Sequence, residues 1–397
     1  MKKVLIITQL FPFPPHINGE TSTLFHLIKS NYVKNFVVDI LYLENERNDS
    51  ENALAGETAR IYNSPATRKE ILMWLDGKVV FKPRGLWNIR SKSIKNLDVR
   101  EYDYIILGSL VETCIIEKLI KRDDTIIILF AADSPILRYY TKNKNEKNLL
   151  NRIYNGLQSL LWKNYKKAIN KYVTKVAYVS EKDSEIAKKS FPEAKVITAR
   201  IGVEEYAEPY DVNFGDAINI GFSGIMTYEP NHDAVEYILN KIAPLLEKHG
   251  LNYRIHIIGK NPDEKWKHYL NNEKIVITGF IDNIEAYIAS MDIYISPLLT
   301  GSGMKNKILQ ALSIGVPIIA SQVSVDGIEG LEPGYNYLLC DDVPENWCNQ
   351  IISLYNDTKK RQEFSNRGKE LIHNDYSWER FARDLFSTSI LSLEEGD

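Results

Sequence analysis

The fold of the second half of the chain is decided by the stretch Ser296-Pro-Leu-Leu-Thr-Gly-Ser-Gly-Met-Lys-Asn-Lys-Ile-Leu-Gln-Ala-Leu-Ser-Ile-Gly-Val-Pro-Ile-Ile-Ala-Ser321. An apolar run ends at residues 293–295, and the glycines at 301 and 303 permit a sharp turn after it. Helical spacing then begins near Met304 and places three apolar side chains on one face: Ile308, Leu309 and Leu312. Gly315, followed by Val-Pro, ends the helix. The pattern therefore predicts a strand, a glycine loop, a helix and a second strand.

The glycine loop before this helix is a candidate phosphate site. Such a loop presents free N–H groups and the positive end of the helix dipole to an anion. Lys305 and Lys307 add two cations to the same turn. An ordinary connection with solvated lysines has the same features, so the loop alone leaves both interpretations open.

Further glycine-containing motifs surround this stretch in a fixed order, at residues 220–234, 257–262, 276–282 and 326–331. This order and spacing resembles the donor-binding half of the retaining glycosyltransferases of family 4, and most of all the branch that builds exopolysaccharide and other surface glycans. The motifs that carry the resemblance lie close together from Ile218 to Leu331, and the resemblance is weaker elsewhere. It implies an α/β protein of the GT-B fold, with two doubly wound Rossmann-like domains that face each other across a cleft.

Composition narrows the functional classes. A chain of 397 residues is long enough for two domains, and its net charge of −3 argues against a general nucleic-acid binder. Three widely spaced cysteines suit a reducing cytosol and form no metal-binding spacing. No run approaches the roughly 18 apolar residues of a membrane span. Residues 1–11 lead into prolines without a cleavage site, so we expect a first strand there rather than a signal peptide.

Apolar runs alternate with helical patterns, which predicts parallel sheets. The expected strands are residues 4–8, 36–43, 104–107, 125–130 and 175–179, then 218–224, 253–258, 275–277, 293–296 and 317–320. We expect an N-terminal domain at 1–210 on the acceptor side and a C-terminal domain at 211–377 on the nucleotide-sugar side. Periodicity lapses at residues 206–215, where the join is expected. The last helix, 378–397, is expected to cross back to the first domain.

Two regions allow more than one interpretation. Residues 44–100 mix charges, Gly and Pro, and form either a variable acceptor-binding face or a surface excursion. Residues 151–172 combine apolar positions at helical spacing with lysines in the second half. This stretch is either a helix packed on the domain core with solvated lysines, or a basic amphipathic helix on an anionic membrane.

The resemblance implies a role for particular residues. Lys305, Lys307 and the backbone N–H groups of Ser302, Gly303 and Met304 would stabilise the leaving pyrophosphate. Gly19, before a helix expected near Thr21, would let a phosphate or sugar approach the backbone of the first domain. The base would lie over Gly279, Phe280 and Ile281. The remaining donor-side candidates follow the ends of expected strands: Gly224, Gly259 and Lys260.

Three further positions carry weaker expectations. Family members usually have a glutamate for the ribose hydroxyls where this chain has Gln310, so the stronger charge-assisted bond is given up. His16, beside the Gly19 loop, is a candidate for a sugar contact, whereas His26 is expected to pack. Asp133 either orients an acceptor hydroxyl or caps the helix that follows it.

The leading hypothesis is a metal-independent glycosyltransferase that needs no cofactor besides its nucleotide-sugar donor. Its acceptor would be a growing surface polysaccharide or a lipid-linked glycan. We expect the protein in the cytoplasm, and the sequence leaves membrane association open. A non-catalytic GT-B subunit is the alternative that Gln310 supports. A sugar-nucleotide epimerase is a third reading, for which the chain lacks an obvious set of acidic and histidine residues.

Overall fold

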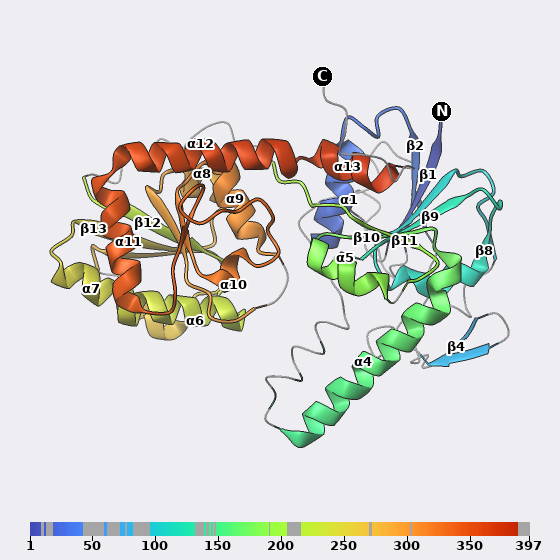
Figure 1. Ribbon diagram of the computed structural model, residues 1–397, viewed down its shortest axis with the longest axis horizontal. Coiled ribbons are helices and arrows are strands. Elements are labelled where there is room, and N and C mark those ends of the chain that lie inside the picture. The colour runs from blue at the N-terminus through green and yellow to red at the C-terminus, as the bar shows by residue number, and fades with distance from the viewer. Residues whose placement is uncertain are drawn as a thin grey trace. The chain divides into compact units, whose positions relative to one another are not determined.

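The computed structural model consists of two compact units (Figure 1). Unit 1 comprises Met1–Gly202 and Trp378–Asp397, and unit 2 comprises Val203–Ser377. The structure describes residues 1–8, 12, 19–42, 59–61, 72–75, 78–81, 96–131, 139, 143, 146, 148–189, 191–204, 216–269, 272–301 and 304–387. The expected join at 206–215 and most of the irregular region 44–100 lie outside these residues.

Unit 1 is built on a parallel sheet with the strand order β11-β10-β9-β7-β1-β2-β3. Its strands are β1 (Lys3–Thr8), β2 (Val37–Tyr42), β3 (Ala59–Ile61), β7 (Tyr104–Leu107), β9 (Ile126–Phe130), β10 (Lys175–Tyr178) and β11 (Lys195–Thr198). Two small pairs accompany it: β4 (Leu72–Leu75) with β5 (Lys78–Phe81), and β6 (Leu97–Asp98) with β8 (Leu119–Ile120). The helices are α1 (Gly19–Lys29), η4 (Glu112–Lys118), α4 (Leu149–Ile169), η5 (Asn170–Tyr172), α5 (Glu181–Lys188) and α13 (Trp378–Phe386).

The central strands of unit 1 are predominantly apolar because both faces of the sheet are covered. Helix α13 completes this core although it comes from the end of the chain. The Trp378 ring stacks on His26, with the ring centroids 4.5 Å apart, and Phe381 meets Phe130 edge to face at 5.6 Å. His26 therefore packs, as the sequence predicts.

Unit 2 has a second parallel sheet, with the order β14-β13-β12-β15-β16-β17. The strands are β12 (Ile218–Ser223), β13 (Tyr253–Ile258), β14 (Ile275–Gly279), β15 (Ile293–Ser296), β16 (Ile318–Ala320) and β17 (Leu338–Leu339). The helices are α6 (Glu229–Tyr237), η6 (Ile238–Ile242), α7 (Ala243–Lys248), η7 (Glu264–Tyr269), α8 (Ile284–Ala289), α9 (Asn306–Ile314), α10 (Gln322–Val325), α11 (Pro344–Asn356), α12 (Thr358–Asp375).

Separate apolar cores lie on the two faces of this sheet, so unit 2 is doubly wound. One core contains residues of α6, η6, α7 and α11, and the other contains residues of α8, α9 and α12. Helix α9 buries the three apolar residues expected on one face, and a Cβ on Gly368 of α12 would lie 3.0 Å from Leu312 Cδ2. Gly315 ends α9 in the left-handed conformation, at a φ of 87°. These predictions are confirmed.

The starts of α1 and α9 differ from the expectation. Helix α1 begins at Gly19 itself rather than near Thr21. Helix α9 begins at Asn306, with Lys305 at the N-cap, because the glycine loop extends slightly further than expected. Helix α6 begins at Glu229, where Pro230 presets the backbone dihedral, and Asn231 lies in its first turn. The Asn231 side chain is thereby freed for the contacts described below.

Candidate functional site

The candidate site of unit 2 lies at the switch point of its sheet. From β12 the chain adds β13 and β14 on one side and then returns to add β15 on the other side. Ligands of open α/β sheets bind beyond the carboxyl ends of the strands at such a reversal. The loops that follow β12, β13, β14 and β15 therefore share one edge. Gly224, Gly259, Lys260, Gly279 and Lys305 stand at or in these loops, and Lys307 stands in the first turn of α9.

Backbone hydrogen bonds hold three of these loops together. Gly224 N donates to Ile258 O at 2.9 Å, Met226 N to Lys260 O at 3.0 Å, and Gly259 N to Gly279 O at 3.1 Å. Gly259 has a φ of 138°, and a Cβ there would lie 1.9 Å from the carbonyl oxygen of Gly224. Only glycine at 259 allows the loops after β12 and β13 to approach this closely.

The loop after β14 offers a flat apolar surface. Gly279 has a φ of 69°, and Phe280, the next residue, is 61 % exposed. The Lys260 ammonium lies 4.5 Å from the centre of the Phe280 ring. Ile281 packs partly into the core under α9. An exposed ring beside turning backbone suits a planar base, which is the role expected for these residues.

Lys307 connects the two loops that flank the switch point. Its ammonium donates to the carbonyl oxygen of Ser223 at 2.8 Å and to Asn231 Oδ1 at 2.7 Å. It also lies 4.2 Å from the centre of the Phe222 ring. Lys307 is therefore anchored at the switch point rather than being a solvated surface lysine.

Lys305 lies in the same loop and is only 9 % exposed. A Cβ on Gly301 would lie 3.5 Å from Lys305 Cε, so the lysine stem covers the glycine at the start of the loop. Burial, together with a smaller contribution from the charge of Lys305, lowers the pKa of Lys307 to about 7. An anion bound at this loop would raise the pKa of Lys307 again, because it favours the charged form of the lysine. Ser302 and Gly303, which were expected to supply backbone N–H groups, lie outside the described residues, whereas Met304 is half-buried beside Lys305.

Gln310 is already engaged by a carboxylate. Its Nε2 donates to Glu285 Oε1 of α8 at 2.6 Å. The expected position for a ribose-binding group therefore holds an amide paired with a carboxylate from another helix. A glutamate at 310 alone would place two carboxylates in contact, which disfavours the charged form of one of them.

Sequence reasoning missed Glu285 and the role of Asn231. Asn231 lies inside the motif at residues 220–234, whereas Glu285 lies outside the motifs. Each contributes through a contact with a lysine or glutamine far along the chain. The sequence carries one indirect signal for Glu285. Asn283 is a polar N-cap that follows the loop at 279–281, and Glu285 stands in the first turn of the helix that it starts.

The unit 1 candidates are only partly described. Gly19 is the first residue of α1, which follows the loop after β1. Strand β1 lies between β7 and β2, so this loop also leaves the switch point of its sheet. His16 and Asp133 lie outside the described residues and stay predictions.

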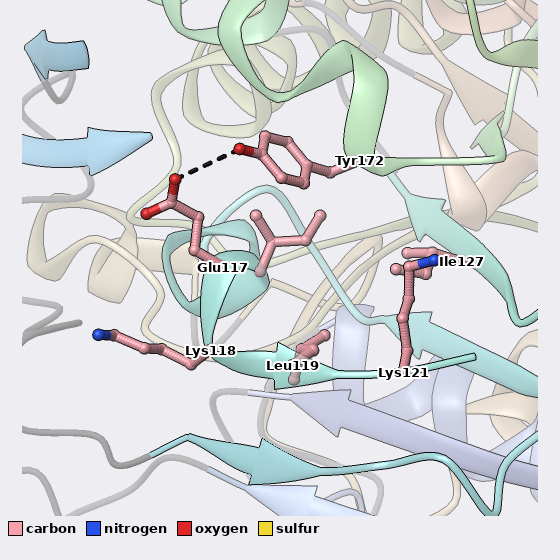
Figure 2. A pocket seen from close by; sticks show the side chains of 7 residues that line it. Glu117, Lys118, Leu119, Lys121, Ile127 and Tyr172 are labelled. Carbon is pink, nitrogen blue, oxygen red and sulfur yellow. Dashed lines mark hydrogen bonds between the residues drawn. The ribbon is translucent and has the colours of Figure 1, made fainter. Parts of the chain in front are cut away.

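A separate cavity of about 390 Å³ lies in unit 1. Figure 2 shows Glu117 and Tyr172 pointing toward each other across it, with Tyr172 Oη donating to Glu117 Oε1 at 3.3 Å. Ile127 stands near the amino end of β9, and Tyr172 precedes β10. The cavity thus opens at the amino ends of the strands, away from the edge where such sheets bind ligands.

Comparison with known proteins identifies the domain around the switch point. Residues 217–357 match the family described as glycosyl transferases group 1. Unit 2 contains a group 1 glycosyltransferase domain. The matched residues begin just before β12 and include every loop of the candidate site, so the four glycine loops and both lysines belong to the glycosyltransferase domain.

Two relatives extend this result. An uncharacterised glycosyltransferase of Methanocaldococcus jannaschii, MJ1069, is 31% identical over 124 residues, which are 29% of this chain and 30% of that relative. The match thus spans less than a third of the archaeal protein. An uncharacterised 44.6 kDa protein in the cps region of Klebsiella pneumoniae is 20% identical over 97% of this chain and 99% of its own length.

Solved structures show the fold of the whole chain. Sucrose-phosphate synthase from Thermosynechococcus elongatus matches with a TM-score of 0.64 at 12% identity, over 96% of both chains. TarM matches with a TM-score of 0.64 at 13% identity, over 98% of this chain and 99% of that one. HepE of Anabaena, in complex with UDP and glucose, matches with a TM-score of 0.62 at 12% identity, over 96% and 98%. The chain has the GT-B fold.

Proposed function

We propose that this chain is a retaining glycosyltransferase that moves a sugar from a nucleotide donor to a surface polysaccharide or a lipid-linked glycan. The observation that carries the proposal is the gathering of four glycine loops and two partly buried lysines at the switch point of a group 1 glycosyltransferase domain. Structural neighbours include HepE in complex with UDP and glucose or with UDP-glucose, and a TarM mutant in complex with UDP and alpha-GlcNAc-glycerol, which supports a nucleotide-sugar donor. UDP-sugars are therefore the first donors to test.

In the proposed step the bond between the sugar C1 and the pyrophosphate oxygen breaks while a bond forms from C1 to the acceptor oxygen on the same face. The acceptor proton passes to the leaving phosphate oxygen, and a nucleoside diphosphate is released. Lys305 and Lys307 would stabilise the negative charge that grows on this group, without a metal ion. Lys307 is already held by Ser223 and Asn231, so its ammonium needs little reorganisation.

Glu285 would supply the carboxylate for the ribose hydroxyls in place of residue 310. The Gln310 amide fixes its Oε1, which leaves Oε2 for a donor hydroxyl. Phe280 would carry the base on its exposed ring. Gly19, His16 and Asp133 are proposed contacts on the unit 1 side, where the acceptor would bind. Transfer would take place in the cytoplasm, at the inner face of the membrane where lipid-linked glycans are built.

A panel of nucleotide sugars, screened first for thermal stabilisation and then for transfer and donor hydrolysis, tests the proposal. A donor that is bound and turned over raises the melting temperature by mass action and releases its nucleoside diphosphate. Lys305→Ala should lose both signals. Binding without transfer or hydrolysis would instead support a non-catalytic GT-B subunit, and a donor converted to another nucleotide sugar would support an epimerase.

A further inference from the structure

Helix α4 of unit 1 carries a continuous apolar stripe that its own unit leaves uncovered. The stripe consists of Leu149, Leu150, Ile153, Leu157 and Leu160, which are 67%, 75%, 61%, 52% and 53% exposed. Steps of four, four and three residues from Leu149 to Leu160 keep the side chains on one face of the helix. Gly156 lies in the same stretch, and a Cβ there would meet open space.

The opposite face of α4 is the one that packs on unit 1. Its buried residues are Asn155, Gln158, Trp162, Tyr165, Lys166 and Ile169. The Tyr165 hydroxyl lies 2.7 Å from Thr113 Oγ1, and the Lys166 ammonium donates to Tyr178 Oη at 2.7 Å. Figure 1 shows the first half of α4 projecting away from the sheet of its unit. The apolar stripe is therefore not a core face. Of the two alternatives for residues 151–172, packing on the core is confirmed for Tyr165 and Ile169 and is wrong for Ile153, Leu157 and Leu160.

The charges beside the stripe have one sign. Residues 149–172 contain no Asp or Glu, whereas Arg152, Lys163 and Lys167 are exposed on α4 and Lys171 is exposed just after it. Glu146 precedes the helix, and its carboxylate accepts from Asn148 N at 2.8 Å and from Asn151 Nδ2 at 3.1 Å. A second copy of the helix would bring like charges together. An anionic lipid surface instead offers acyl chains to the leucines and headgroup phosphates to the cations.

We propose that α4 lies in the interface of an anionic bilayer, with its apolar stripe among the acyl chains and its basic residues against the headgroups. The stripe spans residues 149–160, which is roughly 17 Å at about 1.5 Å per residue. This surface would hold the proposed transferase at a membrane-bound acceptor. It rests on the exposure and charge of α4 alone, so it can fail or succeed independently of the proposed transfer.

Flotation of the full-length protein with vesicles, without any nucleotide sugar, tests the proposal. Wild type should bind vesicles of phosphatidylcholine and phosphatidylglycerol at least about tenfold more strongly than phosphatidylcholine alone, and less as salt rises. The variant Ile153→Ser/Leu157→Ser/Leu160→Ser should lose about tenfold or more of this binding. Gly156→Leu, which extends the stripe into open space, should strengthen it.

The matched control is Leu339→Ser/Val343→Ser/Tyr355→Ser, which removes three exposed apolar side chains from unit 2. It should bind vesicles like wild type. Circular dichroism and the melting temperature confirm that each variant is folded. The proposal is overturned if wild type ignores phosphatidylglycerol, or if the control loses binding as the α4 variant does. It is also overturned if sedimentation shows a lipid-free dimer that the α4 variant dissociates.

Discussion

Helices α4 and α9 are both amphipathic, yet the first half of α4 buries the opposite kind of face from α9. Helix α9 packs Ile308, Leu309 and Leu312 into the core of unit 2 and directs Lys307 and Gln310 to polar partners. The first half of helix α4 packs Asn155 and Gln158 inward, while Leu157 and Leu160 stay exposed; its second half buries Trp162, Tyr165 and Ile169.

The difference between the two helices shows what hydrophobic periodicity predicts and what it does not. A period of 3.6 residues says that one face is apolar, but it does not say what covers that face. In α9 the covering group is the sheet and α12. In α4 the described part of the chain provides none for residues 149–160, and the stripe is accompanied by positive charge. The following predictions test this contrast, from the largest expected effect to the smallest.

The same truncation on the two helices should have very different effects on folding. Leu312→Ala, at a position that is 1% exposed, should lower the free energy of unfolding by about 2–5 kcal/mol because it leaves a cavity. Leu157→Ala, at 52% exposed, should change it by less than about 0.5 kcal/mol. Urea denaturation measures both. Equal losses would mean that the α4 stripe is covered in solution, and the contrast between the helices would disappear.

The polar end of α9 should matter for transfer. Lys305→Ala or Lys307→Ala, or both, should raise the transition-state free energy by about 2–4 kcal/mol, measured as kcat/KM. The sequence suggests exposed lysines with little effect on stability, but the structure buries Lys305 and hydrogen-bonds Lys307. Lys307→Ala should therefore also lower the melting temperature.

Two controls separate these effects. Lys248→Ala, on an exposed lysine of α7, should leave both quantities unchanged. Asn231→Ala removes one partner of Lys307 but keeps the ammonium, so it should slow transfer less than Lys307→Ala. Wild-type turnover in both lysine variants would show that the phosphate assignment is wrong.

Swapping the glutamate at 285 and the glutamine at 310 should be tolerated, whereas a glutamate at both positions should not. Glu285→Gln removes the carboxylate and should weaken binding of a nucleoside diphosphate by about 1–2 kcal/mol. Gln310→Glu places two carboxylates in contact and should lower the melting temperature at neutral pH.

The double variant Glu285→Gln/Gln310→Glu rebuilds the pair with its polarity reversed, so stability and binding should recover together. Titration calorimetry and thermal melting measure these outcomes. If Glu285→Gln binds as tightly as wild type, the carboxylate has no part in ribose recognition.

The smallest effect is on proton binding. Burial lowers the pKa of Lys307 to about 7, so the free protein loses this charge as pH rises through 7. A bound phosphate favours the charged form and raises the pKa again. Binding of a nucleoside diphosphate at pH 8 should therefore take up a fraction of one proton and weaken as pH rises further. Calorimetry in buffers of different ionisation enthalpy measures the uptake.

The two helices provide the comparison for this experiment as well. Lys166 of α4 is also buried, with its pKa lowered to about 7 mainly by burial, but it lies beside Tyr178 in unit 1. Lys307→Arg, which stays charged, should abolish the proton uptake, whereas Lys166→Met should leave it unchanged. Uptake that survives Lys307→Arg would assign the proton to another group.

The sequence by itself determined the α/β class, the strand positions of the second half and the glycine loops around the candidate site. It did so because these features are local. A glycine after an apolar-periodic stretch commonly ends a helix in the left-handed conformation, as Gly315 does, and strands buried on both faces are predominantly apolar. The order of the motifs was sufficient to indicate a glycosyltransferase domain, which the family match at residues 217–357 bears out.

Only the tertiary structure decided which side chains meet. The contact of Lys307 with Ser223 spans 84 positions, and that of Gln310 with Glu285 spans 25. No local pattern records such pairs, because the sheet brings the ends of β12 and β15 together after the chain has reversed. The same holds for α4, whose exposed stripe follows from the polar face that the fold turns inward. Periodicity depends on neighbours along the chain, whereas burial depends on neighbours in space.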